Sequence, residues 1–210
     1  PAAELGRHPR REQPRGEGQS VFGIVQGGNH AALREECAKA LVKMRFDGYA
    51  IGGVSVGEPE PEMMKAIEFT VPFLPEDQPR YAMGLGTPAQ IVELVARGVD
   101  MFDCVLPTRV ARNGTAFTTK GTVSIKAGFN KSDFRPIEEG CECFACRNFT
   151  RAYLRHLFMA EEMLGLRLVS IHNIRFLIRL GELARTAILE GKFDRWRREW
   201  LQRYHRQDED

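Results

Sequence analysis

The chain has little of several features that would settle its class at once. Its 210 residues contain no apolar run long enough to span a membrane or to direct secretion, so we expect a cytoplasmic protein without a membrane partner. The formal net charge is only +2, which by itself does not indicate nucleic-acid binding. No G-x-G-x-x-G fingerprint occurs, which argues against a dinucleotide-binding fold.

Cysteine is also scarce, but three of the five cysteines lie together in Cys141-Glu-Cys143-Phe-Ala-Cys146. This C-x-C-x2-C knuckle presents three soft ligands, and a downstream histidine could complete a tetrahedral zinc site. Two histidines could do so, His156 and His172. A disulfide or three unrelated buried cysteines is the alternative, although such spacing is rare outside metal sites. Four protein ligands leave no open position, so we expect one structural Zn²⁺ per chain.

Residues 1–19 are rich in Pro, Gly, Arg and Glu without apolar periodicity, and we expect a disordered or remnant lead. After them, short β-branched runs alternate with helical patterns. The candidate strands are Val21–Gln26, Gly48–Val54, Arg80–Leu85 and Met101–Leu106, and the helical patterns between them cover His30–Arg45, Pro61–Thr70 and Pro88–Ala96. The alternation predicts an α/β protein with a parallel sheet, either doubly wound or half of a (β/α)8 barrel.

The position of the unusual residues favours the barrel. Gln26-Gly27-Gly28, Gly52-Gly53, Met83 to Gly86, and Asp103 all fall near the C-terminal ends of the predicted strands, where barrel active sites assemble. Each glycine pair alone is a weak signal, because tight β-α turns also use such pairs. Asp103 is more informative, since a carboxylate in a buried apolar strand is costly without partners or a task.

A basic stretch follows Asp103. Between Pro107 and Pro136 there are six Lys or Arg residues and one acid, Asp133. This composition is consistent with phosphate contacts, and a solvated loop face is the alternative.

The stretch Met101-Phe-Asp-Cys-Val-Leu-Pro-Thr-Arg109, followed by Arg112-Asn-Gly-Thr-Ala-Phe117, resembles the nucleophile strand and RNA-reading loop of bacterial tRNA-guanine transglycosylases. These enzymes exchange the wobble guanine of tRNA with a G-U-N anticodon for a queuosine precursor, 7-aminomethyl-7-deazaguanine (preQ1). The resemblance implies that Asp103 is the catalytic nucleophile, which forms a covalent bond to the ribose. It also implies that Thr108, Arg109 and Arg112 contact RNA.

Three other segments agree with this resemblance. Phe22 to Gly27 matches the segment whose glutamine, here Gln26, hydrogen-bonds the base, although a core amide is the plainer interpretation. Asp47 to Glu58 matches the strand that presents the backbone of Gly53 and Val54 to the base, with Glu58 able to meet the preQ1 amine. Tyr81 to Gly86 matches the segment whose Met83 packs on the base, and the loop from Gly84 to Gln90 would contact RNA. Core packing is the alternative for Met83.

Val56 bears on the substrate. Eukaryotic relatives that insert the larger base queuine tend to carry Gly at the matching position, so a branched residue here favours the smaller bacterial substrate, preQ1. The family pattern also takes its fourth zinc ligand from a His-Asn pair, which selects His172 with Cys141, Cys143 and Cys146. We expect Asn148 to Leu164 to form one helix that leaves the knuckle before the chain returns at His172, and His156 to be a packed or capping residue.

The sequence therefore predicts the second half of a (β/α)8 TIM-type barrel with a β-hairpin insertion and a C-terminal helical zinc-binding subdomain. We divide it into residues 1–19 (lead), 20–136 (half-barrel and basic hairpin) and 137–210 (zinc-binding helices). The resemblance covers residues 21–205 and implies a homodimer, but the family's acid-base Asp lies upstream of the match. The alternative is a non-catalytic zinc-bearing RNA-binding or partner subunit, against which the retention of Asp103 counts.

Overall fold

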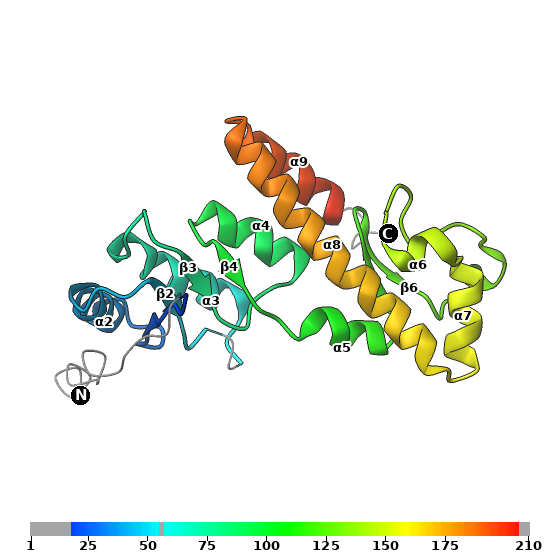
Figure 1. Cartoon of the computed structure of the whole chain (residues 1–210), viewed down its shortest axis with the longest axis horizontal. Coiled ribbons are helices and arrows are strands. Elements are labelled where there is room, and N and C mark those ends of the chain that lie inside the picture. Colours follow the sequence, from blue (N-terminus) through cyan, green and yellow to red (C-terminus); the bar gives the residue numbers. More distant parts are fainter. Residues whose placement is uncertain (1–17, 55–56, 206–210) are drawn as a thin grey trace. The chain divides into compact units, whose positions relative to one another are not determined.

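The computed structural model describes residues 18–54 and 57–205, which form two compact units (Figure 1). The first contains the described residues up to 85 together with 94–103, and the second contains 86–93 and 104–205. The predicted division between residues 136 and 137 does not coincide with these units, because the hairpin packs with the C-terminal helices. Most of the predicted lead, residues 1–17, lies outside the described residues.

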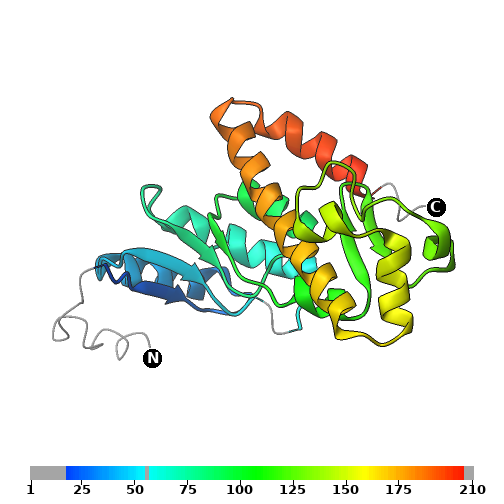
Figure 2. The same ribbon diagram turned by 45° about the vertical axis from the view of Figure 1, so that its right-hand side comes forward.

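The first unit is built on a four-stranded parallel sheet, which confirms the predicted α/β class. Its strands lie in the order β1 (Phe22–Val25), β2 (Gly48–Ile51), β3 (Arg80–Ala82) and β4 (Met101–Phe102), visible side by side in Figure 2. The connections contain α2 (Ala31–Lys43), α3 (Glu60–Glu68), the 3-10 turn η1 (Val71–Phe73) and α4 (Pro88–Ala96). Strand β2 is buried along its whole length, as is typical of parallel sheets covered on both faces.

The register aligns the carboxyl ends of the four strands. The last residues of neighbouring strands pair with one another across the whole sheet. The positions that follow this row are Gln26, Gly52, Met83 and Asp103. Adjacent strands lie about 4.8 Å apart, so these four positions form a short row across the carboxyl ends of the strands.

Two carboxylates accept backbone hydrogen bonds at the amino ends of the strands. Asp47 precedes β2 and accepts a hydrogen bond from the amide of Val21 at 2.7 Å. Asp100 precedes β4 and accepts one from the amide of Arg80 at 2.9 Å. Each carboxylate therefore ties its strand to the preceding one at the amino ends of the strands.

The second unit is organised by the long helix α8 (Met163–Leu189). It packs against α5 (Leu106–Arg112), β5 (Thr115–Thr118), α6 (Phe144–Asn148), α7 (Arg151–Met159) and α9 (Phe193–His205). Strand β5 forms an antiparallel hairpin with β6 (Gly121–Ser124), and the 3-10 turn η2 (Gly128–Ser132) packs on α7. The predicted hairpin and C-terminal helical region are therefore confirmed.

The predicted single helix from Asn148 to Leu164 is wrong. Phe149 is extended, with φ −136° and ψ 145°, and the Thr150 side chain caps a new helix by accepting a hydrogen bond from the amide of Tyr153. That helix, α7, ends before Glu161, whose φ is +56°. The chain returns to the knuckle within α8, which contains His172. None of the helices within the described ranges is both long and apolar enough to cross a membrane.

Candidate functional site

Asp103 is the last of the four positions that follow the strands, and its surroundings differ from those predicted. Strand β4 stops at Phe102, and Leu106 already begins α5 with Pro107 in its first turn, where proline is favourable. The predicted strand from Met101 to Leu106 is therefore too long. Asp103 is exposed rather than buried, so its ionised form does not carry the desolvation cost that a core position would impose.

Two donors hold the Asp103 carboxylate. The Tyr81 hydroxyl donates to Oδ1 at 2.6 Å, and the Gly84 amide donates to the same oxygen at 2.8 Å. These bonds, with Tyr81 the larger contribution, lower the pKa of Asp103 below its ordinary value. The same bond raises the pKa of Tyr81. Both of these bonds use Oδ1, so they orient the carboxylate without engaging Oδ2, and the lowered pKa favours its ionised form.

The glycine turns after β1 and β2 touch each other through Gln26. A Cβ added at Gly52 would lie 2.5 Å from Gln26 Nε2, and one at Gly53 would lie 2.9 Å from Gln26 Oε1. Gly53 also has a φ of +64°, which L side chains rarely adopt. Gln26 is exposed, so the structure does not place it as a core amide. The carboxamide therefore rests on a bare backbone surface that a planar ligand can approach.

The remaining predicted base-site residues have mixed exposure. Met83 and Glu58 are half-buried, whereas the side chain of Val54 is 2% exposed and can offer a ligand only its backbone. Val56, on which the substrate argument depends, lies outside the described residues.

Among the predicted RNA-binding residues, Thr108, Arg109 and Arg112 lie on α5. Both arginines are exposed, and the Thr108 hydroxyl donates to the carbonyl of Val105 at 3.1 Å. Gly84 donates its amide to Asp103, as described above. Gln90 is 7% exposed and forms a reciprocal capping box with Thr87 at the start of α4. Its Oε1 accepts from the Thr87 amide at 3.1 Å, and its amide donates to Thr87 Oγ1 at 3.2 Å.

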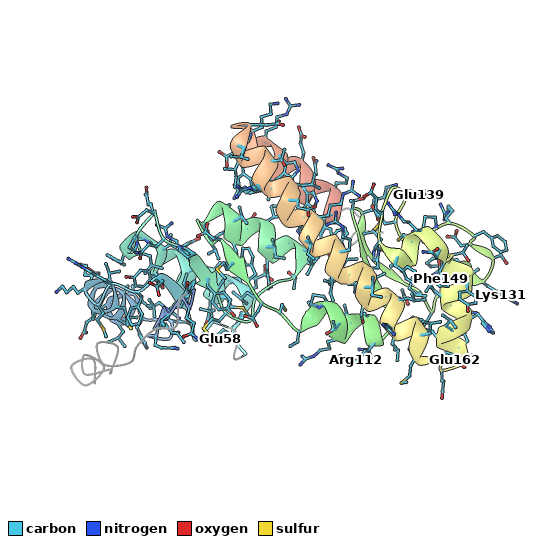
Figure 3. All side chains as sticks on the ribbon, viewed as in Figure 1. Glu58, Arg112, Lys131, Glu139, Phe149 and Glu162 are labelled. Atoms are coloured by element: carbon cyan, nitrogen blue, oxygen red, sulfur yellow. The ribbon has the colours of Figure 1, made fainter. Side chains whose placement is uncertain are left out.

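Two of the basic residues between Pro107 and Pro136 lie on different elements of the second unit. Arg112 and Lys131 project from separate parts of the second unit, α5 and η2 (Figure 3). Arg135 is engaged by Asp133, with Nε and Nη2 at 2.9 and 2.8 Å from the two carboxylate oxygens. Arg135 lowers the pKa of Asp133. Arg109 and Arg112 on α5 and three lysines of this stretch are exposed and stay candidates for phosphate contacts: Lys120, Lys126 and Lys131.

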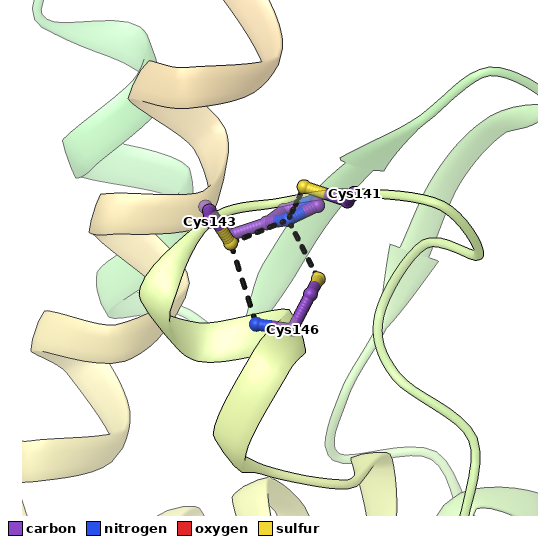
Figure 4. Close-up of side chains that lie close together, drawn as sticks. Cys141, Cys143 and Cys146 are labelled. Carbon is purple, nitrogen blue, oxygen red and sulfur yellow. Dashed lines mark hydrogen bonds between the residues drawn. The ribbon is translucent and has the colours of Figure 1, made fainter.

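The three cysteines of the knuckle lie close together (Figure 4), and their thiols form a cluster with His172. Their Sγ atoms lie 3.8, 3.7 and 3.3 Å from His172 Nδ1, for Cys141, Cys143 and Cys146 respectively. All four ligand atoms lie within 4.8 Å of one another. Tetrahedral zinc with bonds of about 2.3 Å to sulfur and about 2.1 Å to nitrogen would require S···N separations of about 3.6 Å. The cluster therefore has the dimensions of a tetrahedral metal site.

The tautomer of His172 is set by the hairpin. Its Nε2 lies 2.7 Å from the Phe117 carbonyl, to which it can only donate, so Nδ1 offers its lone pair to the thiols. His172 is fully buried, whereas His156 is exposed on α7 beside Tyr153 and lies outside the cluster. The side chains fit a metal ion, and zinc is the ion that this donor set prefers.

Asn173, next to His172, connects the metal cluster to α5. Its Oδ1 accepts from the Phe117 amide at 2.9 Å, and its Nδ2 donates to the carbonyls of Pro107 and Thr115 at 2.9 and 3.1 Å. The side chain is fully buried. Consecutive residues of α8 thus fix both the metal ligand and the helix that carries Arg109 and Arg112.

Two residues that contact these sites were not among the predicted site residues. Tyr81 donates to Asp103, and Arg34 donates to the carbonyls of Gly52 and Gly53. Tyr81 lies in a segment that was singled out only for Met83, and Arg34 lies in a predicted helix. Arg34 occupies the same helical face as Ala38 and Leu41, which are buried. A charged residue at an apolar position of a helix was the available signal for Arg34.

The parallel sheet, with its candidate ligand site at the carboxyl ends of the strands, and a separate Cys3His cluster define an α/β protein. A sequence model described as queuine tRNA-ribosyltransferase matches residues 5–206. The chain therefore belongs to the queuine tRNA-ribosyltransferase family.

Curated relatives agree with this assignment. The chain is 56% identical over 187 residues to the queuine tRNA-ribosyltransferase of Symbiobacterium thermophilum, a match that covers 89% of this chain and 47% of that protein. It is 50% identical over 200 residues to that of Bacillus subtilis, with 95% of this chain and 51% of the relative covered. The chain spans about half the length of these relatives.

Proposed function

We propose that this chain is the C-terminal half of a tRNA-guanine transglycosylase that exchanges the wobble guanine of G-U-N anticodons for preQ1. The observation that carries the proposal is the oriented, ionised Asp103 in one row with Gln26, Gly52 and Met83 at the carboxyl edge of the sheet. In this proposal the sheet is the second half of a (β/α)8 barrel. Family membership and the exposed arginines of α5 support tRNA as the partner.

The proposed reaction has two displacements at one carbon. Asp103 Oδ2 attacks ribose C1′, the bond from C1′ to guanine breaks, and the bonding electrons leave with the base, which takes up a proton. The incoming preQ1 then loses a proton, attacks C1′ and releases the aspartate. The target base must first be turned out of the anticodon loop, and Thr108, Arg109 and Arg112 would hold the neighbouring nucleotides. Two inversions retain the configuration.

Each base-site residue has a separate proposed contact. The Gln26 carboxamide and the backbone of Gly53 and Val54 would bind the edge of the base, and Met83 would pack on its face. Glu58 would meet the aminomethyl group of preQ1. In the family the acid-base group comes from the first half of the protein, so Glu58 is the first candidate for that task if this chain is active alone.

The Cys3His cluster is proposed to hold one structural Zn²⁺ per chain. Four protein ligands complete a tetrahedron, which leaves no position for substrate. The ion would fix the knuckle to α8 and, through His172, to the hairpin. It supplies no chemistry to the transfer.

A homodimer is also part of the proposal. The helices beside the metal cluster present exposed apolar side chains, among them Phe144, Tyr153 and Met159, which are 58%, 42% and 54% exposed. Phe149 stacks on Tyr153 with ring centroids 5.5 Å apart. A row of exposed aromatic and methionine side chains is typical of protein–protein contacts.

The test is exchange of labelled guanine into tRNA with a G-U-N anticodon. The chain is assayed alone and together with the N-terminal half of the Symbiobacterium thermophilum relative, and each is compared with the Asp103→Ala variant. We expect exchange with the added half, and we expect Asp103→Ala to abolish it. Asp77→Ala, which removes another exposed carboxylate of the first unit, serves as the matched control and should retain exchange.

The alternative is a non-catalytic zinc-bearing RNA-binding or partner subunit. Trapping on denaturing gels separates the two, because only a nucleophile leaves a covalent protein–RNA adduct. An adduct that disappears in Asp103→Ala supports the transglycosylase. RNA binding without adduct or exchange, even after the N-terminal half is added, supports the binding subunit.

A further inference from the structure

Arg34 is the only charged side chain among the fully buried residues in the part of the chain that the structure describes, and it lies directly beneath the glycine turns. Its Nε donates to the Gly28 carbonyl at 2.5 Å. Its Nη2 donates to the carbonyls of Gly52 and Gly53 at 3.1 and 3.3 Å. One planar fork thus joins the turn after β1 to the turn after β2.

The remaining guanidinium nitrogen, Nη1, has one neutral side-chain partner, Thr70. Nη1 lies 3.4 Å from Thr70 Oγ1, which in turn donates to the Ala66 carbonyl at 2.7 Å. Within residues 18–54 and 57–205, no carboxylate forms an ion pair with Arg34. Burial lowers the pKa of Arg34, but a guanidinium remains protonated in proteins. Three peptide carbonyls accept hydrogen bonds from its guanidinium, and the nearby Cys37 and Glu58 favour the charged form through space.

The geometry has a consequence for the opposite face of the turn. In a trans peptide, the C=O and N–H groups point in opposite directions, and the described chain has no cis peptide. Since the carbonyls of Gly52 and Gly53 point at Arg34, the amides that share those peptides, Gly53 N–H and Val54 N–H, point away from it. Neither amide has an acceptor among the described residues. A cation bound to a carbonyl polarises that peptide and strengthens its N–H as a donor.

We propose that Arg34 is a positioning residue that turns the Gly53 and Val54 amides toward the base and polarises them, so that they stabilise the negative charge that develops on the departing guanine. This rests on the proposed function, which supplies the base as ligand. As the bond between C1′ and guanine breaks, its electron pair moves onto the base. Fixed donors aimed at that charge lower the barrier without reorganising.

A purely structural role for Arg34 is the competing explanation. The start of α2 presses on the first turn, because a Cβ at Gly27 would lie 2.8 Å from the Arg34 amide nitrogen. Replacing the Arg34 side chain leaves the carbonyls of Gly28, Gly52 and Gly53 without this donor, so it destabilises the unit under either explanation. Only the positioning role predicts a change at Gly53 and Val54 that exceeds the effect of an equally destabilising variant.

The test compares Arg34→Gln and Arg34→Lys with Thr70→Val in the 210-residue chain. Thr70→Val removes the one side-chain partner of the fork and leaves its three carbonyl contacts in place. Three quantities are measured for each: the melting temperature, the amide proton shifts of Gly53 and Val54 in ¹⁵N-labelled protein, and the affinity for guanine by calorimetry.

We expect Arg34→Gln to move both amide protons upfield and to weaken guanine binding at least tenfold. Arg34→Lys, which keeps the charge but not the fork, should fall between it and the unmodified chain. Thr70→Val should lower the melting temperature and leave the amide shifts and the affinity unchanged. Unchanged Gly53 and Val54 shifts in Arg34→Gln, or affinity that falls with the melting temperature in all three variants, would overturn the proposal.

Failure of the proposed function would be visible separately. If the unmodified chain binds no guanine, with and without the added N-terminal half, the base site is wrong. The amide shifts still decide whether Arg34 orients and polarises the turn.

Discussion

Asp103 illustrates how neighbouring groups set the chemistry of a single residue. The hydrogen bonds from Tyr81 and Gly84 fix one oxygen and lower the pKa of the carboxyl group. A lower pKa keeps the aspartate ionised in mildly acidic solution, but it also makes the carboxylate less nucleophilic. Orientation therefore has to compensate, which favours a substrate held in position before attack.

Tyr81→Phe should raise the pKa of Asp103 toward its ordinary value, because the variant removes the larger of the two donors. Since folding depresses this pKa, the bond stabilises the folded chain above the pKa of the unfolded state, and that contribution is lost as pH falls through the folded pKa. The variant should lose it at neutral pH. Carbon-13 titration of the Asp103 carboxyl group measures the shift. Tyr153→Phe, in the other unit, is the control, and an unchanged midpoint in Tyr81→Phe would contradict the assignment.

Asn173→Ala should destabilise the second unit by about 3 kcal/mol, because it leaves one amide and two carbonyls of the hairpin region and α5 without their partner. Urea unfolding followed by circular dichroism measures the change. Asn148→Ala is the matched control, since Asn148 is exposed and bonds only within its own helix; its effect should stay within about 0.5 kcal/mol. Equal losses in the two variants would show that Asn173 does not tie α5 to α8.

The sequence was most informative about residues whose chemistry is unusual in their context. Asp103 in an apolar stretch and the C-x-C-x2-C knuckle could be recognised without a structure. Tyr81 and Arg34 could not, because their partners are a carboxylate and peptide carbonyls on other strands, brought together only by the fold. Backbone groups carry no sequence signature, so a residue that binds them is difficult to predict.

At the scale of elements, helix boundaries were the weakest predictions. Asn148 to Leu164 has a continuous helical pattern, yet the Thr150 cap and the positive φ of Glu161 divide it. Strand β4 was predicted too long because apolar residues continue through Val105 and Leu106, where the chain already turns into α5. In both cases a local capping signal or a proline decided against the periodicity.

Helix α8 connects the metal cluster to the rest of the second unit, because it carries His172 and contacts the hairpin, α5 and α6. Removal of zinc by a chelator should therefore lower the stability of the second unit by at least about 3 kcal/mol, since structural zinc contributes roughly 10–16 kcal/mol in small zinc-binding peptides. Metal analysis should find one zinc per chain. Thermal unfolding with and without chelator gives the stability change.

Cysteine variants provide the control for the metal experiment. Cys143→Ser should abolish zinc binding and reproduce the effect of the chelator. Cys104→Ser, outside the cluster, should leave one zinc bound. A chain that binds zinc equally well in both variants would contradict the assigned ligands.

At the scale of the whole molecule, the first unit is a sheet with two edge strands, β1 and β4. Unpaired edges favour association, and exposed apolar side chains on β1 and β4, such as Ile24 at 44% and Met101 at 44%, are consistent with a partner. The relatives are about twice as long. In the proposed barrel, an N-terminal half would supply the strands that pair with these edges.

The homodimer is tested separately from that pairing. With the N-terminal half added, light scattering should give the mass of two complete assemblies, and Tyr153→Ala should shift it toward one, because the variant removes an exposed ring from the aromatic row. Phe129→Ala is the control, since Phe129 is 71% exposed on η2 and outside that row. A mass that does not respond to Tyr153→Ala would place the contact elsewhere.

The adjacency of His172 and Asn173 reaches beyond stability. One residue binds the cluster, and the next holds the start of the helix that presents Arg109 and Arg112. In the proposed function, loss of the ion or oxidation of its thiolates would weaken the RNA contacts of α5 before it affected the chemistry proposed for Asp103. For a protein of the proposed function, the extent of wobble-base modification would then depend on the supply of zinc in the cell. Zinc scarcity would thereby change how tRNA reads the third codon position.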